Sequence, residues 1–130
     1  MKKNLLLVGI FFALLSVLAG AFGSHALREI FSQENLATYE TAVRYQMYHS
    51  LAILFTALFI TGDNNKYSTA AGLLFVSGII FFCGSLYATT FLKSQSISVP
   101  APLALATPLG GILFACGWVV LAVSILKNKI

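Results

Sequence analysis

The sequence predicts an all-α integral membrane protein, a bundle of four transmembrane helices in a single domain over residues 1–130. Hydrophobic residues make up 58% of the chain and charged residues only 9%, and the mean hydropathy is +0.89. Soluble domains carry about 25% charged residues. A bilayer core takes roughly 20 apolar residues of helix, and four segments have this length, at about 5–22, 42–61, 70–92 and 103–126. Because lipid offers the backbone no hydrogen bonds, each segment should be helical, and short connections make neighbours antiparallel.

The positions of the cations predict the partner and the orientation. The net charge of +4 does not point to nucleic acid, because the lysines flank apolar segments instead of sharing a polar face. The side with both termini and the second connection carries five cations: Lys2, Lys3, Lys66, Lys127 and Lys129. The other side carries Arg28, Lys93 and, at the membrane edge, Arg44. Since cytoplasmic sides hold the excess of Lys and Arg, we expect both termini in the cytoplasm, several passes through the membrane, and the lipid bilayer as partner.

The first segment has two interpretations. Lys2-Lys3, the apolar run and Ala19-Gly20-Ala21 resemble a signal peptide with its cleavage site. However, the run reaches Phe22, which is long for a signal core, and cleavage would leave three spans. We therefore favour a retained first helix.

A short interfacial helix is expected between the first and second spans. In "HALREIF", residues 25–31, Arg28 and Glu29 can face water while four apolar side chains lie on the membrane surface: Ala26, Leu27, Ile30 and Phe31. Gly20 and Gly23 before it let the chain pass close to the second helix. The segment should close over the polar start of that helix.

The second segment carries the candidate site. Ser32 can cap a helix that runs into the membrane, and Glu40 and Arg44 are four residues apart, in the better order for an ion pair. At about 1.5 Å per residue, His49 lies about 18 Å from the inner end. At that depth His49 is either a functional residue or a structural one that forms a hydrogen bond to another helix, and both interpretations stay open. The predicted outward-facing polar pocket comprises His25, Glu40, Arg44, Tyr45, Gln46 and His49.

Small residues and a proline predict how the last two helices pack. Small residues recur at a spacing of four in the pairs Gly84–Ala88, Ala106–Gly110 and Gly111–Ala115. Such faces let backbones approach closely, within the bundle or between copies, so a homo-oligomer is an open alternative. Pro108 in "TPLGG" predicts a kink, with carbonyls exposed to an ion as the alternative. Trp118 should pack inside the bundle. The expected helix-packing residues are Gly20, Gly23, Gly84, Ser85, Pro108, Gly110 and Gly111.

The sequence offers little for catalysis. None of its four acidic residues lies deep in a span, and the first span lacks the acidic residue that small multidrug exporters use. Cys83 and Cys116 have no CxxC spacing, and two histidines with no carboxylate beside them in the membrane make a poor metal site. We expect no catalytic residue, no metal and no cofactor, and an enzyme is the least favoured class.

Four stretches together resemble a known family: "GAFGSHAL", "YETAVRYQMYHSLAIL", "GSLY" and "TPLGG…GW". In this order they are similar to the small bacterial membrane proteins of domain of unknown function 423. The resemblance implies several membrane helices, a multi-pass location in a bacterial inner membrane, and no assigned activity. Its signature corresponds here to Gly20, Gly23, His25, Ala42, Arg44, Tyr45, Gln46, His49, Gly84, Ser85, Tyr87, Pro108, Gly110 and Gly111. Ser24 stands where alanine is common in the family.

Two classes of function remain. In the first, the protein is a small binding or transport component whose pocket takes a lipid head group or a small anionic ligand, since arginine supplies a fixed charge and histidine a titratable group. In the second, it is a structural or accessory protein whose polar cluster locks helix ends together while its surface packs against a partner or itself.

Overall fold

The computed structural model describes residues 1–60 and 66–127, and this part of the chain contains helices and no strand. In chain order its elements are α1 (Lys2–His25), the 3-10 turn η1 (Leu27–Glu29), α2 (Gln33–Leu58), α3 (Lys66–Gly78), the π-helical turn η2 (Ile79–Cys83), α4 (Gly84–Ser94) and α5 (Ala101–Lys127). Because α3, η2 and α4 follow one another without a break, the described residues form four long helices. The second connection and Lys129 lie outside the described residues.

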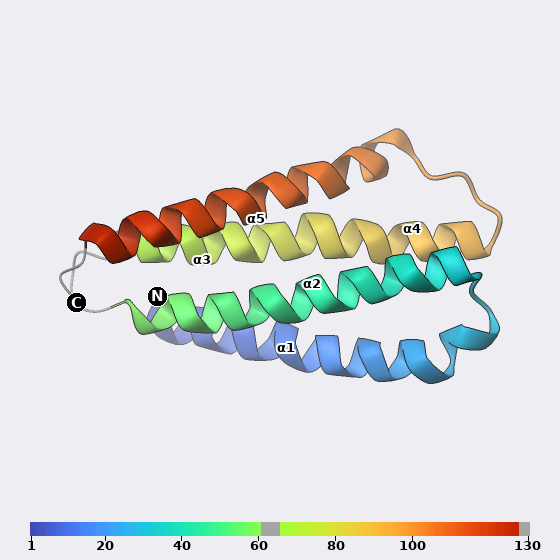
Figure 1. Cartoon of the computed structure of the whole chain (residues 1–130), viewed down its shortest axis with the longest axis horizontal. Coiled ribbons are helices and arrows are strands. Elements are labelled where there is room, and N and C mark those ends of the chain that lie inside the picture. Colours follow the sequence, from blue (N-terminus) through green and yellow to red (C-terminus); the bar gives the residue numbers. More distant parts are fainter. Residues whose placement is uncertain (61–65, 128–130) are drawn as a thin grey trace.

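The four helices lie side by side, with the start of α1 and the end of α5 at the same end of the bundle (Figure 1). We call the opposite end, formed by η1 and residues 95–100, the connection end. Three helices of the described part are long and apolar enough to cross a membrane: Lys2–His25, Lys66–Ser94 and Ala101–Lys127. The predicted all-α membrane bundle is confirmed. The side that the termini face, and the crossing of the more polar α2, stay predictions.

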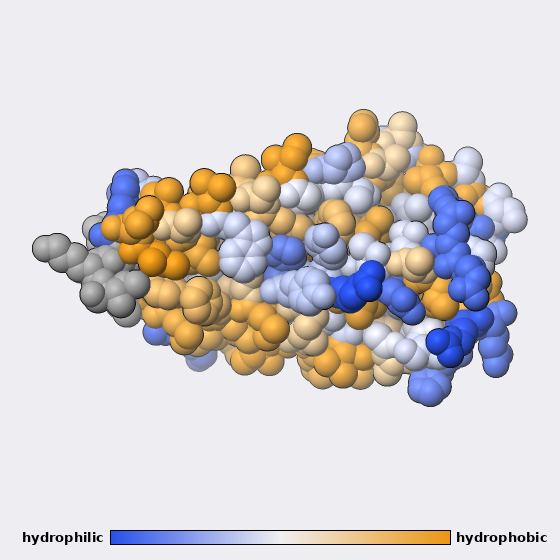
Figure 2. All heavy atoms as spheres, viewed as in Figure 1, coloured by the Kyte–Doolittle hydropathy of each residue, from blue (hydrophilic) through white to orange (hydrophobic). Residues whose placement is uncertain are grey.

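The bundle is apolar on its outside, as a protein in lipid should be. Large apolar side chains along α1 are more than half exposed: Leu7, Ile10, Phe11, Leu14, Val17 and Leu18. In a soluble monomer a continuous apolar surface of this kind would be unusual. Figure 2 shows the apolar surface in orange, with most of the blue residues gathered toward the connection end.

Inside the bundle, hydroxyl groups form hydrogen bonds between helices, and glycines allow the helices to approach closely. Ser85 Oγ lies 2.7 Å from Thr107 Oγ1 and links α4 to α5. A Cβ added to Gly23 would lie 2.6 Å from the Tyr39 ring, so α1 passes close to α2 there. A Cβ added to Gly110 would overlap the backbone of Phe82, so α5 lies directly against η2.

Two expectations about packing residues need correction. A Cβ added to Gly84 would meet nothing within 4 Å, because this residue faces outward from α4. At Gly111 the nearest atom is Phe82 Cδ2, at 4.0 Å. Besides Gly110, two glycines that were not expected to do so contact a neighbouring helix in this region: Gly78 and Gly117, which lie against phenylalanine rings.

The segment after α1 also differs from the predicted interfacial helix. α1 continues to His25, and only the three-residue turn η1 follows. Leu27 and Phe31, four residues apart, are buried and pack with Tyr39 instead of lying on the membrane surface. Their spacing puts both side chains on the side that faces α2. They are therefore buried between the helices and do not contact lipid. The predicted cap of α2 is confirmed, since Ser32 Oγ accepts the N–H of residue 35 at 3.1 Å.

Candidate functional site

The residues of the predicted polar pocket do not form a single site. Five of the six belong to α2 and line three different sites around that helix. Glu40 and Arg44 line a pocket between α1 and α2, Gln46 a second pocket beside α4, and Tyr45 and His49 a groove beside α5. The reason is the helical period, because successive residues turn by about 100°, so residues 44, 45 and 46 point in three directions. His25, the exposed last residue of α1, lines none of these three sites.

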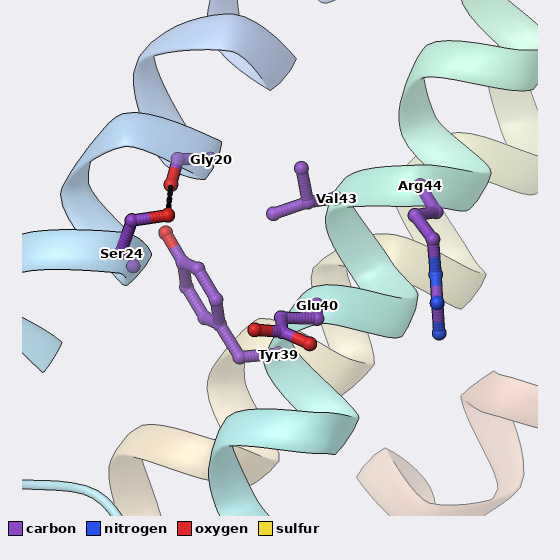
Figure 3. Close-up of a pocket in the computed structure, with 7 residues that line it drawn as sticks. Gly20, Ser24, Tyr39, Glu40, Val43 and Arg44 are labelled. Atoms are coloured by element: carbon purple, nitrogen blue, oxygen red, sulfur yellow. Dashed lines mark hydrogen bonds between the residues drawn. The ribbon is translucent and has the colours of Figure 1, made fainter. Parts of the chain in front are cut away.

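The α1–α2 pocket is the smallest of the three, at about 230 Å³, and is lined by Gly20, Gly23, Ser24, Tyr39, Glu40, Val43 and Arg44. Figure 3 shows Ser24 donating to the Gly20 carbonyl, at 3.0 Å. Glu40 and Arg44 both line the pocket, but their side chains point apart (Figure 3). The ion pair expected between them is therefore not formed, which agrees with the small gain that such exposed pairs give.

Arg44 is left as a cation without a carboxylate partner among the described residues. Its side chain is exposed, and its hydrogen bond is to Thr41 Oγ1, at 3.4 Å. The ion pair found in the described part of the chain joins Lys93 and Glu34, also at 3.4 Å and on the surface. Figure 3 shows the Arg44 side chain running back along α2, toward the start of that helix.

The α1–α4 pocket has apolar walls and a polar floor. It encloses about 400 Å³ and is lined by Leu15, Leu18, Ala19, Phe22, Tyr39, Gln46, Tyr87 and Phe91. Gln46, only 4% exposed, joins three helices: its Nε2 donates to the Phe12 carbonyl at 2.9 Å, and its Oε1 accepts from the Tyr87 hydroxyl at 2.9 Å. The Tyr39 hydroxyl donates to the Ala19 carbonyl at 2.7 Å.

The third site, which we call the aromatic groove, lies between α2, η2 and α5. It measures about 640 Å³ and is lined by Tyr45, Tyr48, His49, Phe82, Gly111, Phe114 and Trp118. The Tyr45 and Phe82 rings stack with their centroids 4.8 Å apart. The face in Figure 2 shows pale and blue residues reaching from the connection end into the middle of the orange surface.

Both ring nitrogens of His49 have partners. Nδ1 lies 2.8 Å from the carbonyl oxygen of Tyr45, and because a carbonyl only accepts, Nδ1 carries the proton. Nε2 then accepts the indole N–H of Trp118, at 3.3 Å. The ring is 6% exposed and stacks on Phe114, with centroids 3.4 Å apart and planes 7° apart. The neutral imidazole thus connects α2 to α5.

Sequence reasoning missed the partners that α4 and α5 contribute. Trp118, expected inside the bundle, is 47% exposed, although its N–H reaches His49. Phe82 and Phe114 carry no signal in the sequence, since an apolar ring in an apolar span is ordinary. Tyr87 could have been found, because a hydroxyl in the middle of a span needs a partner, and Gln46 is the amide that supplies it.

The described residues offer no group of three or more His, Cys, Asp and Glu side chains that could hold a metal ion. Cys83 is buried and Cys116 exposed, and both are free thiols. The three sites around α2 therefore present hydrogen-bonding groups, aromatic rings, the Arg44 cation and the Glu40 carboxylate.

Comparison with known proteins gives a consistent match. The family described as "Protein of unknown function (DUF423)" matches residues 19–111. A UPF0382 membrane protein of Staphylococcus epidermidis is 39% identical over 96% of this chain and 97% of its own length. UPF0382 membrane protein YwdK of Bacillus subtilis is 37% identical over 96% and 98%, and a UPF0382 membrane protein of Haemophilus influenzae is 38% identical over 87% and 86%. No solved structure matches the chain.

Proposed function

Because the chain belongs to the DUF423 family of membrane proteins, whose function is unknown, we propose a function from its own geometry: it holds one anionic lipid in the aromatic groove. The observation that carries the proposal is the position of Arg44. This unpaired cation lies one turn of α2 from Tyr48, toward the connection end, and Tyr48 lines the groove.

The groove suits an apolar chain. Tyr45, Tyr48 and Trp118 are 40%, 57% and 47% exposed, so their rings face the surroundings of the bundle. A volume of about 640 Å³ is within the range of about 300–1,000 Å³ that small-molecule sites have. Gly111 keeps one wall open, because it lacks the side chain that would fill the space beside Phe82.

Arg44 suits an anionic head group. A guanidinium binds the oxygens of a phosphate with two parallel hydrogen bonds. At about 1.5 Å per residue, Arg44 lies about 24 Å from Ile60 along the helix direction. Its long side chain extends further toward the connection end, so the charge can reach the boundary of a hydrocarbon core about 30 Å thick. If both termini face the cytoplasm, as the Lys/Arg distribution predicts, the bound lipid belongs to the outer leaflet.

A structural or accessory role is the second candidate. The observation in its favour is that both ring nitrogens of His49 are already in use: Nδ1 bonds the Tyr45 carbonyl of α2, and Nε2 accepts from Trp118 of α5. In that case the groove surface packs against a partner protein or a second copy of the chain, and the protein has no preference among lipids.

Quenching of Trp118 by brominated lipids separates the two candidates. Trp118 is the single tryptophan of the chain and lines the groove, so its fluorescence reports on the acyl chain beside it. The purified protein would be placed in nanodiscs that contain a small fraction of brominated phosphatidylglycerol or of brominated phosphatidylcholine. We expect stronger quenching by the anionic lipid, because Arg44 retains its head group. Equal quenching by both lipids would overturn the proposal and favour the structural role.

Matched variants assign the effect to the site. Arg44→Gln should remove the preference for phosphatidylglycerol, whereas Arg28→Gln, which removes an exposed cation of the same end, should keep it. Gly111→Leu should fill the groove and reduce quenching by both lipids. Gly84→Leu, at the glycine with open space around it, is its control. A preference that survives Arg44→Gln would show that another cation selects the lipid.

A further inference from the structure

Three polar side chains, those of Tyr39, Gln46 and Tyr87, are among the residues that line the α1–α4 pocket. The carbonyl of Phe12 only accepts, so the amide nitrogen of Gln46 must point at it and the amide oxygen at Tyr87. The Tyr87 hydroxyl therefore has to donate to Gln46. The Tyr39 hydroxyl donates to the Ala19 carbonyl in the same way. Both phenol protons are in use, and each phenol oxygen keeps lone pairs that can only accept.

This pocket is open toward the outer surface of the bundle, between α1 and α4. Leu18 and Phe22 of α1 and Phe91 of α4 are 56%, 51% and 40% exposed and line its sides, while Tyr39 and Gln46 are almost completely buried at its floor. An occupant therefore enters from the lipid. Tyr39 and Gln46 are seven residues apart, so the polar floor extends about 10 Å along the bilayer normal at 1.5 Å per residue.

We propose that the α1–α4 pocket binds a neutral lipid with a free hydroxyl group, such as a long-chain alcohol or a diacylglycerol. The apolar body lies against Leu18 and Phe91, and the hydroxyl donates to the phenol oxygen of Tyr87 or Tyr39. A ligand with only ether or ester oxygens lacks the proton that these acceptors need. In hydrocarbon no water competes for them, so the hydroxyl decides the selection.

The two proposals are independent. The α1–α4 pocket and the aromatic groove have no lining residue in common, and they involve successive residues of α2, Gln46 and Tyr45, which point about 100° apart. Lipid charge selects the occupant of the groove, and a hydroxyl proton selects the occupant of the pocket. Either site can therefore be disproved while the other stands.

A matched pair of photoreactive probes tests the second site. One probe is a long-chain alcohol with a diazirine in its chain, and the other is its methyl ether. Each is added to the full-length protein in phosphatidylcholine nanodiscs, and mass spectrometry locates the labelled residues after irradiation. We expect the alcohol to label α1 and α4 about five-fold more than the ether, the ratio for one intramembrane hydrogen bond of about 1 kcal/mol at 1.4 kcal/mol per tenfold.

Variants show whether the pocket is responsible. Tyr87→Phe removes one acceptor and should reduce the preference for the alcohol. Leu18→Trp should block the opening and reduce labelling by both probes, whereas Leu14→Trp, on the same helix and equally exposed, should not. If Tyr87→Phe does not fold, the Leu18 and Leu14 pair still decides the location. Equal labelling of the wild type by alcohol and ether, or labelling that Leu18→Trp leaves unchanged, would overturn the proposal.

Discussion

Replacing His49 by alanine and by phenylalanine separates two contributions of its ring. Alanine removes both the packing against Phe114 and the hydrogen bond from Trp118. Phenylalanine keeps a flat ring of similar size in the same stack and removes only the hydrogen bonds. The comparison therefore measures whether His49 holds α2 to α5 mainly by packing or mainly by polar contacts.

The expected magnitudes follow from the burial of the ring in lipid. In soluble cores, replacing a large aromatic residue by alanine costs about 3–5 kcal/mol. Part of that cost is transfer from water, which is missing between helices in lipid, so about 2 kcal/mol of lost packing remains. The hydrogen bond adds about 0.6 kcal/mol, the average for pairs inside a membrane protein. We expect His49→Ala to lower the free energy of unfolding by about 2–3 kcal/mol and His49→Phe by about 1 kcal/mol or less.

Unfolding in mixed dodecylmaltoside and SDS micelles, followed by far-UV circular dichroism, measures these differences. Tyr48→Ala is the control, because its ring lies in the same groove but is 57% exposed, and it should change stability by less than about 0.5 kcal/mol. The reasoning is refuted if His49→Phe is as unstable as His49→Ala, or if His49→Ala unfolds at the wild-type SDS fraction.

Three further substitutions have definite expected outcomes in the same unfolding assay. Gly110→Ala should cost at least about 2 kcal/mol, because its Cβ would overlap backbone atoms of η2 that cannot move aside, whereas Gly111→Ala should be neutral; similar values for the two would contradict the described packing. In a double-mutant cycle, Ser85→Ala and Thr107→Val should couple by about 0.6 kcal/mol, and strict additivity would mean that their hydroxyls are not bonded. Ser32→Ala should cost about 1 kcal/mol through loss of the helix cap, and an unchanged midpoint would show that α2 starts elsewhere.

The helices could be predicted because each depends on local composition. Apolar runs of bilayer length and charged residues at their ends are enough to place a span, and Ser32 gave the start of α2. The turn η2 could not be predicted, since "IIFFC" is compatible with an ordinary α-helix. Its backbone lies against another helix, with Phe82 next to Gly110, and a contact between such distant segments leaves no local pattern.

The candidate site shows the same division. Glu40 and Arg44, predicted from their spacing of four to lie close together on α2, line the same pocket. Tyr45 and His49, predicted to share that pocket, line the aromatic groove instead. The spacing could not show what each face meets. The identification of Trp118 as the partner of His49 depends on how α2 and α5 are placed, which is a property of the whole bundle.

The π-helical turn sets the rotation of α4 relative to α3 in the third long helix. Four inward-facing residues, Phe75, Ile79, Cys83 and Tyr87, follow one another at a spacing of four. In a plain α-helix this spacing drifts by about 40° at each step, and Tyr87 would end about 120° from Phe75. The π turn holds one residue more than an α-helical turn, which returns Tyr87 to the inward face and within reach of Gln46. A residue inserted or deleted within 79–83 would rotate the whole of α4 out of phase with its partners, while the same change in residues 95–100 would be absorbed by the connection.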